Sequence, residues 1–273
     1  MIRVRNILFY IWRIYRFIVD EVALEIHISD HCNLNCKSCT HYSPIAKQNY
    51  VDINSLSNEL FIIKKKKIIN FFSEIRLLGG EPLLNPNLIE ILDIVRNIFP
   101  KKKINLITNG LLLNNMSNDF FNCCKRNNIK ISITKYPCNI DYENLLKLMR
   151  DKGMNCIIYD DRTNNYSFYE SKLSYKTKSI WRNFYNCFDQ NCFQLKGGRL
   201  YSCPQSAHVD ILNDYLKQKF TRNESDFIRI DDINYLKILK FRYLPKQFCR
   251  YCILPRKRFN WEKSTTHINE WVE

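Results

Sequence analysis

Between residues 24 and 159 the sequence alternates short apolar runs with longer amphipathic segments. The runs predict strands at Leu24 to Ser29, Glu74 to Leu78, Ile104 to Thr108, Lys130 to Thr134 and Asn155 to Tyr159. The segments between them predict helices that begin near Asp52 and Asn85-Pro86 and that cover residues 118 to 127 and 141 to 152. Strands joined by helices are typical of a parallel sheet, because the chain must cross back before each new strand. The pattern therefore predicts an α/β fold.

Chemically distinctive residues follow three of these strands. A group of cysteines follows the first strand, Gly79-Gly80-Glu81-Pro82 follows the second, and Asn109-Gly110 follows the third. In parallel α/β folds the reactive residues gather at the carboxyl ends of the strands, because the strand-to-helix loops meet there. We therefore expect these three segments to form one site.

The chain contains twelve cysteines among its 273 residues. No typical secretory signal precedes them, because Arg13 and Arg16 interrupt the N-terminal apolar stretch and no small-residue cleavage site follows. The expected location is the reducing cytoplasm, where disulfides are rare. Clustered cysteines are therefore interpreted as ligands of a metal or cluster, or as catalytic thiols.

Cys32, Cys36 and Cys39 form a Cys-x3-Cys-x2-Cys arrangement on the loop after the first predicted strand. Electron-transfer clusters usually take four cysteines, so a loop with three leaves one iron open to a substrate or cofactor. A zinc ion would need a fourth ligand such as His31 or His41, and zinc sites more often use well-separated Cys-x2-Cys pairs. The spacing favours an iron–sulfur cluster over zinc.

The cysteine triplet and the Gly-Gly-Glu-Pro turn together resemble the radical S-adenosylmethionine (radical SAM) superfamily. The resemblance implies a partial (β/α)6 TIM-like barrel of parallel strands, in which the three cysteines ligate a SAM-binding 4Fe–4S cluster. It further implies that SAM chelates the fourth iron, and that its reductive cleavage yields methionine and a 5′-deoxyadenosyl radical.

The same resemblance implies cofactor-binding roles for Gly79, Gly80, Glu81, Pro82, Asn109 and Ser132. The glycines would let the backbone approach the SAM amine without a Cβ in the way, and Glu81 would fix the turn or accept charge-assisted hydrogen bonds. The residue before the third cysteine is commonly aromatic in this family, whereas here it is Ser38. Adenine contacts are therefore expected from elsewhere, for example His41 or Tyr42.

A second cysteine set lies in the C-terminal part of the chain. Phe193 to Tyr201 predicts a hairpin that turns at Gly197-Gly198. The metal ligands expected around and beyond it are Cys187, Cys203, Cys249 and Cys252, with Cys192 as a substitute for Cys187. This order resembles the twitch form of the SPASM domain, which implies a second, auxiliary 4Fe–4S cluster, although four thiolates also suit structural zinc. We interpret Cys123, Cys124, Cys138 and Cys156 as core residues or inert thiols.

The expected organisation has three parts, because the strand and helix alternation stops near residue 165. Residues 1–23 would form a basic amphipathic helix, 24–165 the radical SAM barrel and 166–273 the auxiliary-cluster domain. Residues 1–19 carry arginines among aromatic and aliphatic side chains, so either docking on the protein body or peripheral contact with the inner face of the membrane is expected.

The cysteine placement resembles that of the 2-deoxy-scyllo-inosamine dehydrogenases of butirosin biosynthesis. This implies oxidation or epimerisation at a carbinol carbon of a sugar- or cyclitol-like small molecule, with flavodoxin or ferredoxin as the electron donor. Polar strand-end candidates for the substrate pocket are Lys135, Tyr136, Asp160, Asp161 and Arg162. Radical modification of a ribosomal peptide is an alternative, although no winged-helix leader-binding segment is recognisable.

The net charge of +15 motivates a hypothesis of another class, a metal-stapled nucleic-acid-binding module. The lysine runs at 64–67 and 101–103 are more simply interpreted as solvated surface. We therefore expect no nucleic-acid partner.

Overall fold

The computed structural model describes residues 21–138, 140–159, 167–176 and 178–273. The basic segment 1–19 and the candidate pocket residues Asp160, Asp161 and Arg162 lie outside the described residues. No helix in the described ranges is long and apolar enough to cross a membrane.

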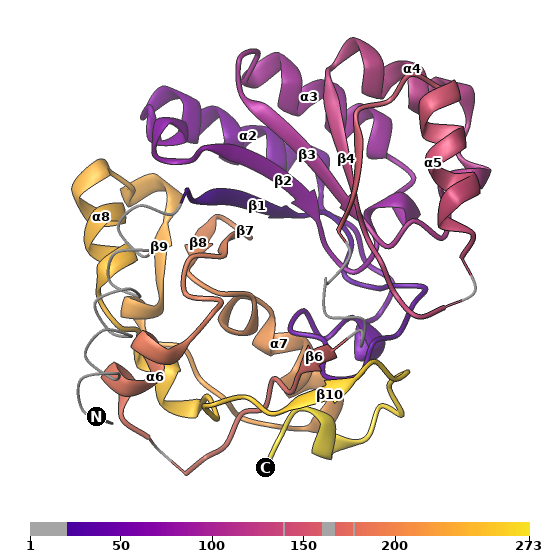
Figure 1. Ribbon diagram of the computed structural model, residues 1–273. Coiled ribbons are helices and arrows are strands. Elements are labelled where there is room, and N and C mark those ends of the chain that lie inside the picture. Colours follow the sequence, from indigo (N-terminus) through magenta and orange to yellow (C-terminus); the bar gives the residue numbers. More distant parts are fainter. Residues whose placement is uncertain (1–20, 139, 160–166, 177) are drawn as a thin grey trace, which may run out of the picture.

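One curved sheet of eight strands organises the chain (Figure 1). Its order is β5 (Cys156–Tyr159), β4 (Ile129–Thr134), β3 (Lys103–Thr108), β2 (Glu74–Leu78), β1 (Ala23–His27), β7 (Phe193–Lys196), β8 (Arg199–Tyr201) and β9 (Phe227–Arg229). Every pairing from β5 to β7 is parallel, and the pairings of β7 with β8 and of β8 with β9 are antiparallel. The α/β class and the largely parallel, partial-barrel sheet are confirmed.

The sixth parallel strand comes from the C-terminal part of the chain. β7 pairs in parallel with β1, with Leu24 opposite Phe193 and Ile26 opposite Leu195. The predicted hairpin is confirmed, since β7 and β8 are joined through Gly197 and Gly198, which both have left-handed φ angles. The sheet is thus continuous across residue 165, where the sequence pattern predicts a domain change.

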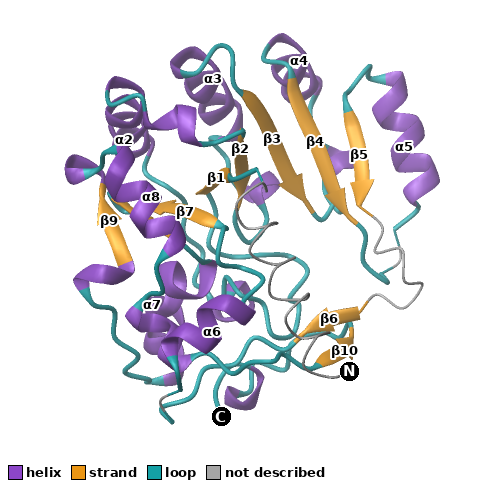
Figure 2. Cartoon of the chain, turned by 60° about the vertical axis from the view of Figure 1, so that its left-hand side comes forward, coloured by secondary structure: helices purple, strands orange, loops and turns teal. Residues whose placement is uncertain are grey.

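Helices α2 to α5 cover the outer side of the parallel strands (Figures 1 and 2). The α-helices are α2 (Ile53–Lys65), α3 (Leu88–Ile98), α4 (Asn118–Arg126), α5 (Tyr142–Asp151), α6 (Ile180–Asn186), α7 (Pro204–Leu216) and α8 (Tyr235–Tyr243). Short 3-10 helices lie at η1 (Ser43–Ile45), η2 (Ile68–Phe71), η3 (Pro82–Leu84), η4 (Leu113–Asn115), η5 (Glu224–Asp226), η6 (Ile230–Asp232), η7 (Gln247–Tyr251) and η8 (Ile268–Glu270).

Local sequence signals account for where the helices start. Asp52 accepts a hydrogen bond from Ser55 N at 2.8 Å and so caps α2, as its position before an apolar stripe predicts. Asn85 does not start α3, because its side chain donates to Ile28 O at 2.6 Å and accepts from Asn87 N. The helix therefore begins at Leu88, and Asn85 instead ties its N-terminal turn to the end of β1.

The two faces of the sheet differ in chemistry. Residues such as Leu24, Ile26 and Ile131 are buried in the large apolar core beneath helices α2 to α5. The alternate positions on the same strands are polar and point to the barrel interior, as expected from the two-residue period of a strand. The buried polar residues of this interior face include Glu25, His27, Asn105, Ser132 and Gln194.

A C-terminal segment lies near the carboxyl ends of strands β3, β4 and β5 (Figure 2). β10 (Arg258–Asn260) pairs antiparallel with β6 (Ser167–Tyr169), apart from the main sheet (Figure 2). A second apolar core forms around Tyr42, Leu173 and Trp271, which are all fully buried. This core packs the end of the chain against the loop that follows β1.

The interior charge of Glu25 predicts a pH-dependent stability. Burial raises the pKa of Glu25 from 4.5 to about 7, despite the opposing effect of Arg76. The folded state therefore binds a proton more tightly than the unfolded state, and the free energy of unfolding should fall as pH rises from about 5 to above 7. The full shift corresponds to at most about 3 kcal/mol.

Glu25→Gln should remove this titration, so that its melting temperature changes less between pH 5.5 and pH 8 than that of the wild type. Circular dichroism melts of both proteins at the two pH values measure the difference. Glu81, another buried acid, is present in both proteins and cancels in the comparison. Equal pH dependence in the two proteins would contradict the expectation.

Candidate active site

The loop after β1 brings Cys32, Cys36 and Cys39 to one cavity of about 180 Å³. Asn35 and Ser38 have left-handed φ angles of 55° and 58°, so the backbone curls twice between the cysteines. The other residues that line this cavity are Leu34, His41, Ser43, Pro44, Leu78, Gly79, Gly80, Ile107, Thr108, Asn109, Thr134 and Tyr136. The structure thus brings together the three strand-end segments that the sequence predicts to form one site.

Gly79 and Gly80 allow two segments of backbone to lie against each other. Gly80 N donates to Ser29 O at 2.7 Å, and Glu81 N donates to His31 O at 3.0 Å. A Cβ on Gly79 would lie 2.3 Å from Ser29 O, and one on Gly80 would lie 2.1 Å from His31 O. The space that the glycines leave is therefore filled by the cysteine loop itself. Glycine is therefore required at both positions by the approach of that loop, in addition to any approach of a cofactor expected from the sequence.

Glu81 connects the turn to the end of β3. Its carboxylate accepts hydrogen bonds from Leu83 N at 3.0 Å, Thr108 Oγ1 at 2.7 Å and Asn109 N at 2.9 Å. Burial raises the pKa of Glu81 to about 7. Of the two roles considered from the sequence, the geometry favours fixing the turn, since three protein donors already occupy the carboxylate. The next residue, Pro82, is buried and begins η3.

Asn109 and Ser132 lie on the interior side of neighbouring strand ends. Asn109 Nδ2 donates to Asn33 Oδ1 at 2.8 Å and lies 3.7 Å from Cys32 Sγ, so this residue supports the cysteine loop. Ser132 does not line the cavity, but Thr134, two residues further along β4, does. Ser132 Oγ is buried without a hydrogen-bond partner among the described residues. Such an orphaned hydroxyl suits a ligand that reaches into the interior.

The end of the chain covers the cysteine loop, which sequence reasoning missed. Trp261 Nε1 donates to Cys36 Sγ at 3.2 Å, and Trp271 Nε1 donates to Cys39 O at 3.0 Å. Lys37 N also donates to Glu262 O at 3.0 Å in a strand-like bridge. No periodic pattern around these tryptophans marks them as partners of a loop more than 200 residues earlier.

The side chains of Ser38 and Tyr42 contact other parts of the protein and do not line the cavity. Ser38 Oγ donates to Glu270 O at 2.7 Å and so anchors the C-terminal segment. Tyr42 has a left-handed φ of 57°, which turns its ring into the second apolar core, where it is fully buried. Of the two residues expected to contact adenine, His41 lines the cavity and Tyr42 does not.

Tyr136 is the strand-end candidate that reaches the cavity. Its ring stacks on Phe168 with centroids 5.6 Å apart and lies 6.2 Å from the Trp261 ring. Lys135 does not line the cavity, and its ammonium lies over the Tyr142 ring. The structure therefore separates these two neighbouring candidates.

The thiols of the loop are held in a desolvated environment. Burial raises the pKa of Cys32 to about 11 and that of Cys36 to about 12. A buried thiolate is stable only beside positive charge, which a bound cluster or metal supplies. Three converging thiols at a cavity therefore fit an iron–sulfur cluster by the chemistry of the donor set.

Four C-terminal cysteines line a second cavity. Cys187, Cys203, Cys249 and Cys252 border it together with Lys246, and Cys192 is not among its lining residues. Cys192 instead lies near Glu25: burial raises the pKa of its thiol most, and the negative charge of Glu25 raises it further. Of the two alternatives for the first ligand, the geometry favours Cys187. This donor set, too, fits a four-thiolate cluster or zinc.

Three of the four remaining cysteines, Cys123, Cys124 and Cys156, lie in or against the large core, whereas Cys138 lies in the loop after β4 with its thiol 3.8 Å from Tyr136 O. Cys123 and Cys124 are fully buried in the large core. Cys156 packs against the same core from β5. None of these three thiols lines either cysteine-lined cavity.

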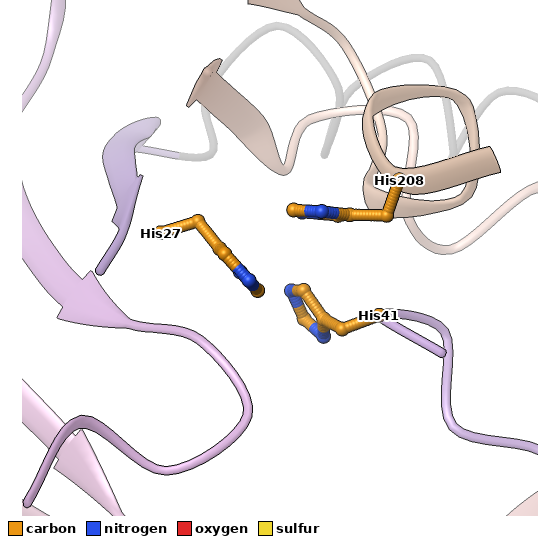
Figure 3. Close-up of side chains that lie close together, drawn as sticks. All are labelled: His27, His41 and His208. Carbon is orange, nitrogen blue, oxygen red and sulfur yellow. The ribbon is translucent and has the colours of Figure 1, made fainter. Parts of the chain in front are cut away.

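Three histidines meet in the barrel interior (Figure 3). His27 lies on β1, His41 follows the cysteine loop and His208 lies on α7. The centroid of the His27 ring lies 5.4 Å from that of His41 and 4.0 Å from that of His208. Burial lowers the pKa of all three imidazoles. No sequence spacing suggests this group, because its members come from three distant segments.

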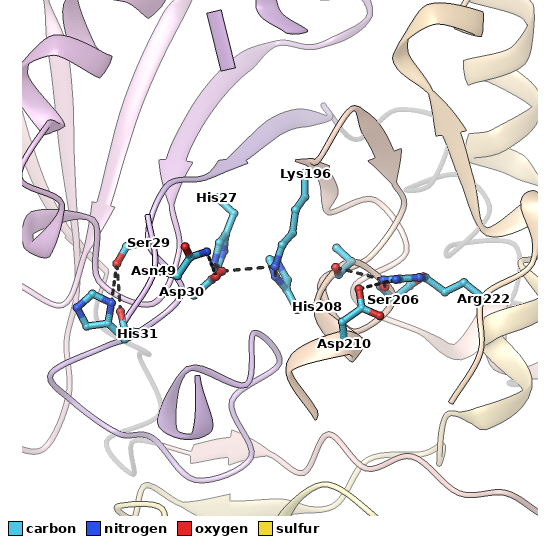
Figure 4. A network of polar contacts seen from close by, with 11 residues as sticks. His27, Ser29, Asp30, His31, Asn49, Lys196, Ser206, His208, Asp210 and Arg222 are labelled. Carbon is cyan, nitrogen blue, oxygen red and sulfur yellow. Dashed lines mark hydrogen bonds and ion pairs between the residues drawn. The ribbon is translucent and has the colours of Figure 1, made fainter. Parts of the chain in front are cut away.

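Charged residues lie beside two of these histidines, His27 and His208 (Figure 4). Asp30 Oδ1 lies 2.9 Å from His27 Nε2, and Asn49 Nδ2 donates to Asp30 Oδ2 at 2.7 Å. The Lys196 ammonium lies 2.9 Å from His208 Nδ1 and 3.4 Å from Asp30 Oδ1. The interior beside the cysteine loop is therefore polar, with both signs of charge.

Gly80→Ala tests the close approach of the turn to the cysteine loop. The added Cβ would collide with the backbone of His31, so we expect a large fall in melting temperature. Gly198→Ala is the control, because its left-handed φ of 69° costs about 1 kcal/mol while no atom lies within 4 Å of the added Cβ. Equal melting temperatures for the two variants would count against the collision.

Residues 26–157 match the family model described as the radical SAM superfamily. GTP 3′,8-cyclase of Trichodesmium erythraeum (strain IMS101) is 34% identical over 127 residues, which cover 45% of this chain and 37% of that protein. GTP 3′,8-cyclase of Alkaliphilus oremlandii (strain OhILAs) is 33% identical over 90 residues, which cover 33% of this chain and 28% of that protein. The chain thus spans only about a third of the length of these curated relatives.

A solved structure with a similar fold is BtrN in complex with AdoMet and 2-DOIA. Its TM-score is 0.53 at 15% sequence identity, and the alignment covers 85% of this chain and 92% of that chain. At this identity the likeness concerns the fold, which extends beyond the radical SAM match into the C-terminal part. The part of the chain that matches this family model contains the cysteine loop of Cys32, Cys36 and Cys39 and the Gly79-Gly80 turn.

Proposed function

We propose that this chain holds two 4Fe–4S clusters and removes a hydrogen atom from a polar, sugar- or cyclitol-like substrate, with oxidation or epimerisation as the outcome. The observation that carries the proposal is the cavity that all three loop cysteines share with the Gly79-Gly80 turn and Asn109. His41 lines this cavity and also belongs to the polar interior. A substrate in the interior would therefore lie beside the cluster.

In this proposal Cys32, Cys36 and Cys39 hold the first cluster and leave one iron for SAM. Such a cluster, when bound, supplies the electron that cleaves SAM and starts radical chemistry. The N–H groups of Gly80 and Glu81 already donate to the cysteine loop, and Glu81 O accepts from Leu84 N. The carbonyl oxygens of Gly79 and Gly80 are therefore proposed to accept from the SAM amine. Asn109 and Ser132 are proposed to complete the SAM site.

The interior side chains suit a hydroxylated substrate. Glu25, His27 and Lys196 offer charged or polar atoms along β1 and β7, and the Ser132 hydroxyl has no protein partner among the described residues. Buried groups of this kind are stabilised when a ligand supplies the missing hydrogen bonds. An apolar substrate would leave them unsatisfied.

Oxidation of a carbinol to a carbonyl removes two hydrogens from the substrate. The carbon-bound hydrogen leaves as an atom, the hydroxyl hydrogen leaves as a proton, and one further electron must be accepted. An auxiliary cluster held by Cys187, Cys203, Cys249 and Cys252 would supply that acceptor. BtrN, which shares the fold, was solved with AdoMet and 2-DOIA, so a cyclitol-like ligand is a reasonable first probe for this chain.

The cluster assignment predicts distinct iron contents for cysteine variants. Anaerobically reconstituted wild-type protein should be brown, hold about eight irons and release 5′-deoxyadenosine from SAM under dithionite. Cys36→Ala should lose about four irons and nearly all 5′-deoxyadenosine formation. Cys203→Ala should lose about four irons but keep SAM cleavage, and Cys192→Ala should match the wild type.

Iron analysis and chromatography of the SAM products measure these outcomes. Colourless protein with zinc bound to the cysteines would overturn the proposal in favour of a metal-stapled module. Unchanged 5′-deoxyadenosine formation by Cys36→Ala would overturn the assignment of the first cluster. A loss of iron in Cys192→Ala equal to that in Cys203→Ala would reverse the choice of Cys187 as ligand.

Trp261→Phe should make the first cluster harder to reduce. The indole N–H that donates to Cys36 Sγ stabilises the additional negative charge of a reduced cluster, so its removal should shift the reduction potential to a more negative value. Iron content should stay unchanged, because the phenyl ring can keep the contact with Tyr136. Slower SAM cleavage should accompany the shift.

Electron paramagnetic resonance during a redox titration measures this potential. Trp181→Phe is the matched control, since Trp181 is 50% exposed and does not line the cavity of the cysteine loop. An unchanged potential in Trp261→Phe would show that this hydrogen bond does not tune the cluster.

A further inference from the structure

We propose that His27, His41 and His208 bind a divalent metal ion of the zinc class, which holds an oxygen of the substrate beside the radical SAM cluster. One potential ligand atom from each histidine lies within 4.8 Å of the other two. In Figure 3 the three rings converge from β1, the loop after the cysteines and α7. None of its three ligands is a cysteine of either set, although His41 also lines the cavity of the cysteine loop.

Each of the three imidazoles has a buried nitrogen that lacks a hydrogen-bond partner. These atoms are both ring nitrogens of His27, together with His41 Nε2 and His208 Nε2, judged against the described residues. The side chains of His27 and His208 are almost entirely buried, with 6% and 0% exposure. Buried ring nitrogens without partners are rare in folded proteins unless a ligand or an ion satisfies them. Their convergence indicates a shared ligand.

The surroundings of His27 resemble those of a metal ligand. Asp30 Oδ1 lies 2.9 Å from Nε2 but is not aligned for a hydrogen bond. A small rotation of the ring would let the carboxylate accept a proton from Nε2, which leaves Nδ1 with its lone pair. Asn49 holds the other oxygen of the Asp30 carboxylate at 2.7 Å. A carboxylate behind a coordinating histidine orients the ring and raises its basicity. Asp30 would therefore position His27 without touching the ion.

Lys196 is the group that opposes a cation here. Its ammonium lies 2.9 Å from His208 Nδ1, and donation to this atom would place the histidine proton on Nε2. The same ammonium lies 3.4 Å from Asp30 Oδ1, so it can turn to the carboxylate when the ion binds. Metal binding and the Lys196–His208 hydrogen bond thus compete.

The donor set selects the class of metal. Three neutral imidazoles suit zinc and similar first-row ions, and zinc sites with three protein ligands keep one position open for water or substrate. Zinc–nitrogen distances of about 2.0–2.1 Å place the ligand nitrogens of a tetrahedral site about 3.4 Å apart. Ring nitrogens within 4.8 Å of one another therefore need to close by at most about 1.5 Å. Side-chain rotation supplies such a movement.

The position of His41 gives the ion a role in the reaction. His41 lines the cavity of the cysteine loop, so the open coordination position would lie next to it. A hydroxyl or carboxylate oxygen on the ion would hold the neighbouring carbon near the place where hydrogen abstraction starts. The ion would also lower the pKa of a bound hydroxyl. This inference extends the proposed function, and its test does not depend on SAM cleavage.

Zinc binding by the cluster-reconstituted full chain tests the proposal. Equilibrium dialysis against buffered Zn²⁺ should show one zinc per chain, and His27→Gln/His208→Gln should bind it at least tenfold more weakly. His267→Gln is the matched control, because this histidine lies in the C-terminal segment and is not part of the group. Iron content equal to that of the wild type checks that the double variant is folded.

Lys196→Met should strengthen zinc binding, whereas misfolding of a variant could only weaken it. Removal of the competing ammonium should tighten zinc binding at least threefold. With Co²⁺ as the probe, electron paramagnetic resonance should show a signal that the double histidine variant loses and His267→Gln keeps. No zinc beyond the cysteine sites, equal zinc in the double variant, or weaker binding by Lys196→Met would each overturn the proposal. SAM cleavage by these proteins reports separately on the function proposed above.

Discussion

The close contact between the Gly79-Gly80 turn and the segment Ser29 to His31 is the constraint on which the rest of the site depends. The backbone hydrogen bonds of Gly80 and Glu81 extend the pairing of β1 and β2 past the end of the sheet. Any side chain on the turn would occupy the space of the cysteine loop. The loop is therefore held against a rigid strand end, which suits a cluster that must keep a fixed relation to its cofactor.

The barrel separates two kinds of interaction on the two faces of one sheet. The outer face is apolar and provides the packing energy that stabilises the fold. The inner face carries polar groups whose burial is costly, such as Glu25 and the three histidines. Buried titratable groups of this kind are concentrated at functional sites. The cysteine loop at the same end of the barrel is consistent with a binding site in this interior.

Much of the fold is predictable because its signals are local. Strand β2 occupies the predicted residues, the Asp52 cap begins α2 and the Gly197-Gly198 turn joins β7 to β8. The sixth parallel strand is different. β7 is short, and nothing in its own residues distinguishes a hairpin in a separate domain from a strand that pairs with β1. The pairing of β7 with β1 becomes evident only in the assembled sheet, because strand partners are set by tertiary packing and not by the residues of one strand.

The sequence by itself determined the chemistry of the cysteine loop, because Cys32, Cys36 and Cys39 lie within one short turn whose spacing limits what they can bind. It also determined the turn that supports them. The tertiary structure alone decided that Cys187 rather than Cys192 borders the second cavity, that Trp261 contacts Cys36 and that three histidines meet. The physical reason is distance along the chain. Residues such as Trp261 and Cys36, 225 positions apart, come together only when every intervening element has packed.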